Sequence, residues 1–110
     1  MITTKTEKYT LIKPTCKLVS DFLTTFNNRY SEFTGNHLII DLSEKFNIQI
    51  EELMLFLEVS TQHRNNGTSF VVIVQGIDID DVPDEINVVP TLTEAIDILE
   101  MDAIERDLGF

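Results

Sequence analysis

Residues able to do acid–base, metal or nucleophilic chemistry are few and scattered in this chain. His37 and His63 are the two histidines, and Cys16 is the one cysteine among 110 residues. Zinc sites combine such ligands at close spacing, and these residues have neither an i, i+4 pair of histidines nor a cysteine cluster. A reactive thiol needs a neighbour that favours the thiolate, and Cys16 has no visible base beside it. We therefore interpret both histidines as structural and Cys16 as an ordinary residue.

Other catalytic patterns are incomplete. The acidic run 78–81 is followed by Val82 and Pro83, so it lacks the alternating ligands and central glycine of a calcium loop. The four glycines stand apart, which excludes a glycine-rich phosphate loop. Ser43 ends a predicted strand, but no Gly-x-Ser-x-Gly surrounds it. We expect a protein that is not an enzyme, has no metal site and needs no cofactor.

The net charge of −11 is placed unevenly along the chain. Residues 1–45 contain six Lys/Arg and five Asp/Glu, whereas residues 46–110 contain two Arg and fourteen Asp/Glu. Clustered carboxylates repel phosphate, so we expect neither a nucleic-acid ligand nor an anionic membrane surface. Two interpretations remain open: a solvated acidic face that serves solubility, or a surface for a basic protein partner.

Length and composition indicate one domain spanning residues 1–110 with its own hydrophobic core. No apolar run approaches the roughly 20 residues of a membrane-spanning helix. The N-terminal residues lack a hydrophobic segment of the signal-peptide type, and a single cysteine fits a reducing compartment. We expect a cytoplasmic protein.

Hydrophobic periodicity predicts strands that alternate with helices. The predicted strands are residues 6–13, 37–43, 70–74 and 87–90, with an extra strand possible at residues 1–4. The predicted helices are residues 17–33, residues 49–64 and the segment after the Thr91–Glu94 capping box, with one helical turn near residues 82–85. This alternation predicts an α/β fold, with a mostly parallel (mixed) sheet of four to five strands and three to four helices.

Two of the predicted helices have informative apolar patterns. The first has one stripe, composed of Leu18, Val19, Phe22, Leu23, Phe26, Tyr30 and Phe33. The second has a stripe composed of Ile50, Leu53, Met54, Leu57 and Thr61. Leu55, Phe56 and Val59 fall off that second stripe and widen the apolar surface. A helix that is apolar on two sides is either deeply buried or keeps a patch for a partner.

One stretch carries a recognisable pattern. Asp41-Leu42-Ser43 is followed by five residues and then by the run 49–53, Gln-Ile-Glu-Glu-Leu. Gly67 and the strand 70–74 continue in register, and Thr93-Glu94-Ala95 opens the last helix. Over residues 6–106 the chain resembles the STAS domain, the fold of bacterial anti-sigma factor antagonists and of sulfate-transporter tails. The resemblance implies a STAS-like α/β fold and a regulatory protein-binding function.

The resemblance also implies where a regulatory site would lie. The family has Asp-Ser-Ser-Gly-Leu at this helix start, and its phosphorylated serine falls on Glu51 here. Gln49, Ile50 and Glu52 take the positions of the family's aspartate, preceding serine and glycine. Glutamate cannot be phosphorylated, so we expect no kinase-controlled switch at this position. Glu51 is then either a fixed negative charge at the helix N-terminus or an ordinary first-turn acid.

The function we predict is therefore that of a STAS-like regulatory module without the phosphorylatable serine. The partner would be a protein such as an anti-sigma factor-like regulator, and the chain itself a monomer or weak homodimer. The candidate partner-binding residues are Ser43, Gln49, Ile50, Glu51, Glu52, Met54 and Leu55.

Two alternatives stay open. One is a small-ligand sensor for nucleotides or anions, with its pocket at the ends of the parallel strands near Ser43 and Gly76. The other follows from similarity to short chains assigned to ribonuclease Z. Two histidines cannot supply that family's histidine-rich dinuclear zinc site, so this alternative is an accessory role beside an RNA-processing nuclease.

Overall fold

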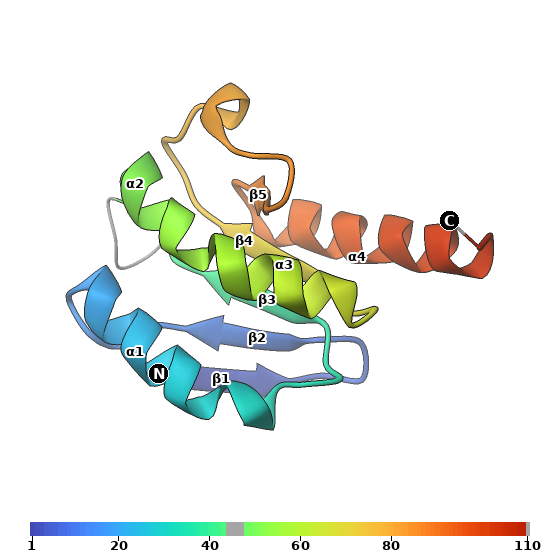
Figure 1. Ribbon diagram of the computed structural model, residues 1–110, viewed down its shortest axis with the longest axis horizontal. Coiled ribbons are helices and arrows are strands. Elements are labelled where there is room, and N and C mark those ends of the chain that lie inside the picture. The colour runs from blue at the N-terminus through green and yellow to red at the C-terminus, as the bar shows by residue number, and fades with distance from the viewer. Residues whose placement is uncertain (44–47, 110) are drawn as a thin grey trace.

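A five-stranded mixed sheet organises the molecule (Figure 1). The computed structural model describes residues 1–43 and 48–109. The sheet order is β1-β2-β3-β4-β5, with β1 antiparallel to β2 and all other neighbours parallel. The strands are β1 Ile2–Lys5, β2 Thr10–Lys13, β3 Leu38–Asp41, β4 Phe70–Ile73 and β5 Asn87–Val89. The helices are α1 Val19–Arg29, α2 Ile50–Leu53, α3 Leu57–Asn65 and α4 Leu92–Asp107. The predicted α/β architecture is confirmed.

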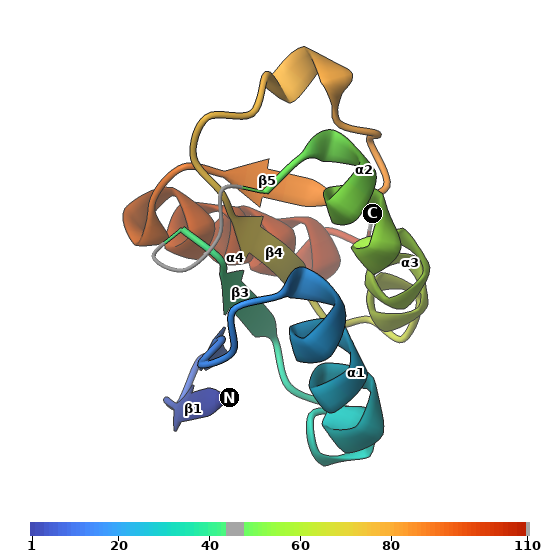
Figure 2. The ribbon, with the colours of Figure 1, turned by 90° about the vertical axis from the view of Figure 1, so that its left-hand side faces the viewer.

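The helices divide between the two faces of the sheet. Figure 2 shows α1, α2 and α3 on one side, called the front face here, and, of the helices in residues 1–43 and 48–109, α4 alone on the other, called the back face. The strands β3 and β4 pack against helices on both sides, and their side chains are nearly all buried. This is the burial expected of central parallel strands, and it explains their continuous apolar runs.

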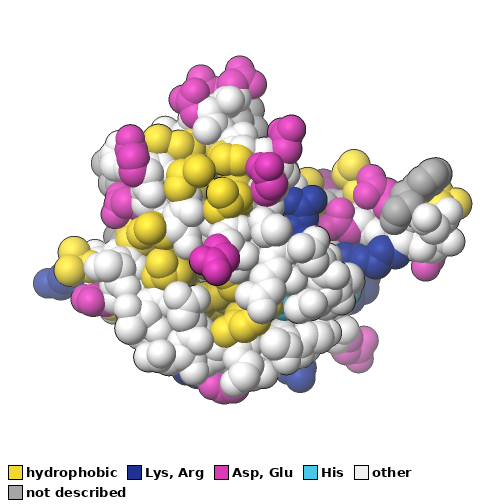
Figure 3. Space-filling model, viewed as in Figure 1, with side chains coloured by type: hydrophobic (Ala, Val, Ile, Leu, Met, Phe, Trp, Pro, Cys, Tyr) yellow, Lys and Arg dark blue, Asp and Glu magenta, His cyan; other side chains and the backbone are white. Residues whose placement is uncertain are grey.

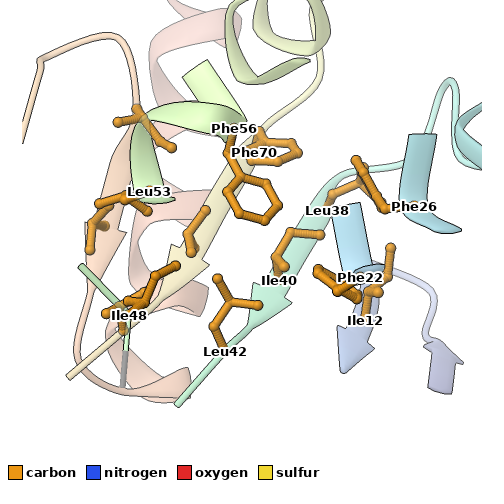
Figure 4. Packing of buried hydrophobic residues seen from close by; sticks show 14 of the residues in the cluster. Ile12, Phe22, Phe26, Leu38, Ile40, Leu42, Ile48, Leu53, Phe56 and Phe70 are labelled. Atoms are coloured by element: carbon orange, nitrogen blue, oxygen red, sulfur yellow. The ribbon is translucent and has the colours of Figure 1, made fainter. Parts of the chain in front are cut away.

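The main hydrophobic core lies under the front face (Figure 4). Phe26 of α1 is at its centre, with its ring centroid about 6 Å from those of Phe22, Tyr30, Phe33 and Phe70. The predicted aromatic stripe is therefore core packing. Leu18 is the exception, because it precedes α1 and is exposed.

The predicted helix over residues 49–64 is interrupted. A 3₁₀ turn at Met54–Phe56 separates α2 from α3. A 3₁₀ turn has three residues per turn, so residues three apart point the same way. Leu53 and Phe56 consequently both face the core, and both are fully buried. The predicted stripe was wrong at two positions, because Phe56 is inside and Met54 is on the surface.

The N-terminal strand also differs from the prediction. Two strands form a hairpin, and the extra strand considered for residues 1–4 is real. The predicted strand over residues 6–13 begins only at Thr10, because Thr6 forms the turn. Its hydroxyl oxygen accepts hydrogen bonds from the amides of Lys8 and Tyr9, at 3.2 Å and 3.0 Å. Such side-chain to backbone bonds compete with strand pairing.

Smaller differences occur elsewhere. The first predicted helix ends in a 3₁₀ turn at Tyr30–Glu32, and Gly35 then adopts a positive φ of 87°. The helical turn expected near residues 82–85 lies earlier, at Ile79–Asp81. The predicted N-cap of the last helix is confirmed, since the Thr91 hydroxyl accepts from the Glu94 amide at 3.2 Å.

Candidate functional site

The start of α2 is held by its own side chains. The Gln49 amide donates to the Glu52 carboxylate at 3.0 Å, which satisfies one of the free amides at the helix N-terminus. Glu52 is half-buried and has this structural task, whereas Glu51 is exposed. Of the two adjacent glutamates, Glu51 is therefore the one whose charge faces solvent.

Ser43 lies at the carboxyl end of β3. Its hydroxyl and its amide both donate to the Asp41 carboxylate, at 2.6 Å and 3.0 Å. These bonds form a local turn that ends the strand. The connector predicted over residues 44–48 lies outside the described residues except for Ile48, which is buried in the front core. Ser43 is thus a turn residue.

An apolar patch is exposed where the 3₁₀ turn follows α2. Met54 is 40% exposed and Leu55 is 51% exposed. Leu55 also lines a groove of about 300 Å³ between α1 and α3, together with Asn27, Tyr30, Glu58, Val59 and Gln62. In Figure 3, hydrophobic side chains gather over α2 and toward α1, with acidic side chains around them. We call Tyr30, Met54, Leu55 and Val59 the front patch, with Glu51 and Glu58 as its acidic edge.

A buried hydrogen-bond chain supports the patch from below. Nε2 of His63 donates to the Asn36 carbonyl at 2.6 Å, so Nδ1 is the acceptor for the Tyr30 hydroxyl, also at 2.6 Å. His63 is fully buried beside Phe70. Burial lowers the pKa of His63 below 6.5, and burial raises the pKa of Tyr30 above 10.0. His63 is therefore a neutral structural group that fixes Tyr30.

The predicted site residues are brought together only in part. Glu51, Met54 and Leu55 share one exposed surface. Ile50 is half-buried against the front core, while Gln49 and Glu52 hold the helix start. Sequence reasoning did not assign Tyr30 or Glu58 to the site and used Val59 only to widen the apolar surface. The available signal was Tyr30 itself, the one residue of the first aromatic stripe with a polar tip.

A second, polar cleft lies at the amino ends of β4 and β5. It measures about 500 Å³ and is lined by side chains that include Arg64, Arg106, Asp84, Glu85 and Asp102. Both arginines of residues 46–110 lie here, and both already have partners. Arg64 donates to the Asp84 and Glu85 carbonyls, and Arg106 donates to the Ser69 hydroxyl at 2.8 Å. With carboxylates around it, the cleft is a poor site for an anion.

Ser69, His37 and Asp102 meet beside this cleft but do not form a catalytic triad. The Ser69 hydroxyl donates to the Asp102 carboxylate at 2.7 Å, and the Ser69 amide donates to Nδ1 of His37 at 2.9 Å. A nucleophilic serine needs its hydroxyl on a histidine nitrogen, and here the hydroxyl is bound to a carboxylate. Burial lowers the pKa of His37 below 6.5. The group is a structural junction between β3, β4 and α4.

The strand order gives no support for a small-ligand site at the carboxyl ends of the parallel strands. Open α/β sheets bind ligands where the strand order reverses. In the described part of this chain, the strand order follows the chain order without a reversal. Within the described residues there is also no group of three histidines, cysteines or carboxylates able to hold a metal ion.

No protein-family model matches the chain, and no curated protein matches it either. In the described part of the chain, no helix has the length and apolar character needed to cross a membrane.

Proposed function

We propose that this chain is a regulatory module, without enzymatic activity, that binds a protein partner through the front patch. The observation that carries the proposal is the pair Met54 and Leu55. They project from a tight 3₁₀ turn beside a groove that Tyr30 and Val59 line. Two large exposed apolar side chains next to a preformed groove are typical of a protein-binding surface.

The chemistry of the front patch defines the partner. Its centre is apolar, so the partner would place an apolar side chain against Met54 and Leu55. The groove between α1 and α3 is also lined by Asn27, Glu58 and Gln62, so it would receive polar groups of the partner. The edge of the front patch has Glu51 and Glu58, which favour lysine or arginine on the partner around that apolar side chain. An amphipathic helix with one apolar anchor and a basic flank meets both requirements.

The STAS resemblance supports the same surface. Glu51 occupies the position of the family's phosphoserine, and it is exposed in the first turn of α2. In this proposal Glu51 is a permanent negative charge at the helix N-terminus, and the partner would be an anti-sigma factor-like regulator in the cytoplasm. An RNA-processing nuclease is the alternative partner, and it would use the same surface.

Affinity capture from an extract of the source cells tests the proposal. The baits are the wild-type chain, Leu55→Asp and Glu51→Lys, with Ile104→Asp on the back face as the matched control. Each bait is first shown to be folded by circular dichroism. We expect the wild type and Ile104→Asp to capture the same protein in equal amounts. With Leu55→Asp, the captured amount of that protein should fall at least about tenfold. Glu51→Lys should lose less, because its charge lies at the edge.

The captured protein is then purified and titrated against the same variants. Equal affinity for the wild type and for folded Leu55→Asp would contradict the proposed surface. Loss of binding with Ile104→Asp alone would move the partner to the back face.

A further inference from the structure

The back face of the sheet is only half covered. α4 packs on β4 and β5, and its core contains Ile39, Val71, Ile73, Ala95 and Leu99. The hairpin of β1 and β2 extends beyond α4 (Figure 2). All four residues of β1 are exposed, and Leu11 of β2 is half-buried on the back face. Five strands need about two helices to cover one face, as on the front, and the described residues place one helix on the back.

A groove marks the place where the second helix would lie. It measures about 380 Å³ and runs between α4 and the turn of the β1–β2 hairpin. Its charged lining residues are Lys8, Glu7 and Glu100, and its apolar walls are formed by Tyr9, Ile96, Leu99 and Ala103. The groove is therefore an apolar surface on the uncovered side of α4.

The outward side of α4 combines apolar and acidic residues. Met101 and Ile104 of α4, and Leu108 just after it, are between 57% and 65% exposed, and Asp97 and Glu100 on the same side are exposed too. An α-helix turns once in 3.6 residues, so Ile104, nine positions after buried Ala95, points in the opposite direction. The three apolar residues therefore face away from the sheet that α4 covers. Figure 1 shows the C-terminal half of α4 projecting beyond the rest of the fold.

The outward side of α4 and the uncovered β1–β2 hairpin with its groove are complementary to each other. We propose that the back face is an interface between two copies of this chain, related by a two-fold axis. The two α4 helices would lie side by side, antiparallel, in one layer between the two sheets. Each would keep Ala95 and Leu99 on its own sheet and place Met101 and Ile104 on the partner's β1–β2 hairpin. A two-fold interface requires one surface to match itself, which a helix side with exposed apolar residues next to an uncovered sheet satisfies.

The charges also favour a second copy as the occupant. Lys13 lies on the same face of β2 as Leu11, and Lys8 lines the groove with Glu7, whereas α4 has six carboxylates and one arginine. An acidic helix over a lysine-bearing hairpin is locally attractive. The net charge of −11 per copy acts against this at long range. Salt screens the long-range repulsion more than it weakens the buried apolar contact, so dimerisation should strengthen as ionic strength rises.

Sedimentation equilibrium of the full chain, over a wide concentration range, tests the interface. We expect the wild type to dimerise, and Ile104→Asp and Met101→Asp to raise the dissociation constant at least about tenfold, because each buries an unpaired carboxylate. Leu55→Asp on the front face is the control and should dimerise like the wild type. A wild type that stays monomeric at every concentration and salt would overturn the proposal, as would a dimer that Leu55→Asp disrupts and Ile104→Asp does not.

A cross-linking experiment tests the geometry. Thr4 pairs with Leu11 and so shares the back face of the hairpin. In a chain with Cys16→Ser, Thr4→Cys and Ile104→Cys, mild oxidation should give a disulfide between copies, seen as a dimer on a non-reducing gel. The matched chain has Leu55→Cys in place of Ile104→Cys and should run as a monomer on the same non-reducing gel. Equal cross-linking of both chains would overturn the proposed arrangement.

Discussion

The front and back faces of the sheet differ in how completely they are built. Among the described residues, the front core contains sixteen buried apolar side chains, including five phenylalanines, whereas the back core contains five and no aromatic ring. In the part of the chain that the structure describes, α1 and the α2–α3 pair cover the front, and α4 alone covers the back. The front core therefore contains most of the buried apolar side chains, and the front patch above it is the surface that we propose binds a protein partner. The back face still lacks a covering element, which a second copy can supply.

Core truncations on the two faces should give the largest difference in the free energy of unfolding. Phe26→Ala should lower the free energy of unfolding by about 3–5 kcal/mol, because it removes a fully buried ring from the centre of the front core. Leu99→Ala on the back face should lower it by about 2 kcal/mol, since its surroundings are thinner and partly open to solvent. Urea denaturation followed by circular dichroism measures both. A larger loss for Leu99→Ala than for Phe26→Ala would mean that the back core carries the fold.

The hydrogen bond between Tyr30 and His63 under the front face should make the stability of the protein depend on pH. Burial lowers the pKa of His63 in the folded chain, so the unfolded chain binds the proton first as the pH drops. The stability that neutral His63 supports is complete above its ordinary pKa of 6.5 and decreases as the pH falls below that value. His63→Phe should be less stable than the wild type at pH 7. Between pH 7 and pH 5, its free energy of unfolding should decrease less than that of the wild type. Urea midpoints at several pH values measure this.

The pKa of His37 is also lowered by burial, so part of the pH dependence should remain in His63→Phe. Tyr30→Phe is the matched variant, because it removes the hydroxyl donor and keeps the ring. Tyr30→Phe should lower the free energy of unfolding by about 1 kcal/mol at pH 7, because Nδ1 of His63 loses its hydrogen-bond donor. An identical pH profile for the wild type and His63→Phe would contradict the neutral, buried state of His63.

The two glutamates at the start of α2 give the smallest effect. Glu52→Ala should lower the free energy of unfolding by about 0.5–1 kcal/mol, because the Gln49 amide loses its acceptor. Glu51→Ala should change it by less than about 0.5 kcal/mol, because Glu51 is exposed. Thermal unfolding compares the two variants directly. If Glu51→Ala is the more destabilising, Glu51 has a structural role, and its proposed function in binding loses its basis.

Local pattern was sufficient for the kind and order of most elements. The stripe through Phe22 and Phe26 defined α1, the apolar runs defined β3 and β4, and Thr91 defined the start of α4. Each of these signals depends on neighbours within one or two turns. The misassigned pair, Met54 and Phe56, depended on a 3₁₀ turn that the periodicity of an α-helix cannot register.

Only part of the candidate site was within reach of the sequence. Glu51 was identified through the STAS resemblance, and Met54 and Leu55 through the apolar pattern of residues 49–64. Tyr30 is held at the groove by a hydrogen bond to His63, which is 33 residues away in the sequence. A contact of that separation depends on how α1 and α3 pack on the sheet, so the spacing of residues in one segment contains no information about it.

The amino-acid sequence alone specifies an α/β chain with a buried parallel centre, a strongly acidic second half and a two-sided apolar pattern at residues 49–64. These properties follow from composition and local periodicity, which each segment carries alone. Tertiary structure decided which side of that segment faces outward, which face of the sheet stays half covered, and that both arginines of the acidic half meet at one edge. Those outcomes depend on strand order and helix placement, and both result from contacts between segments far apart in the chain.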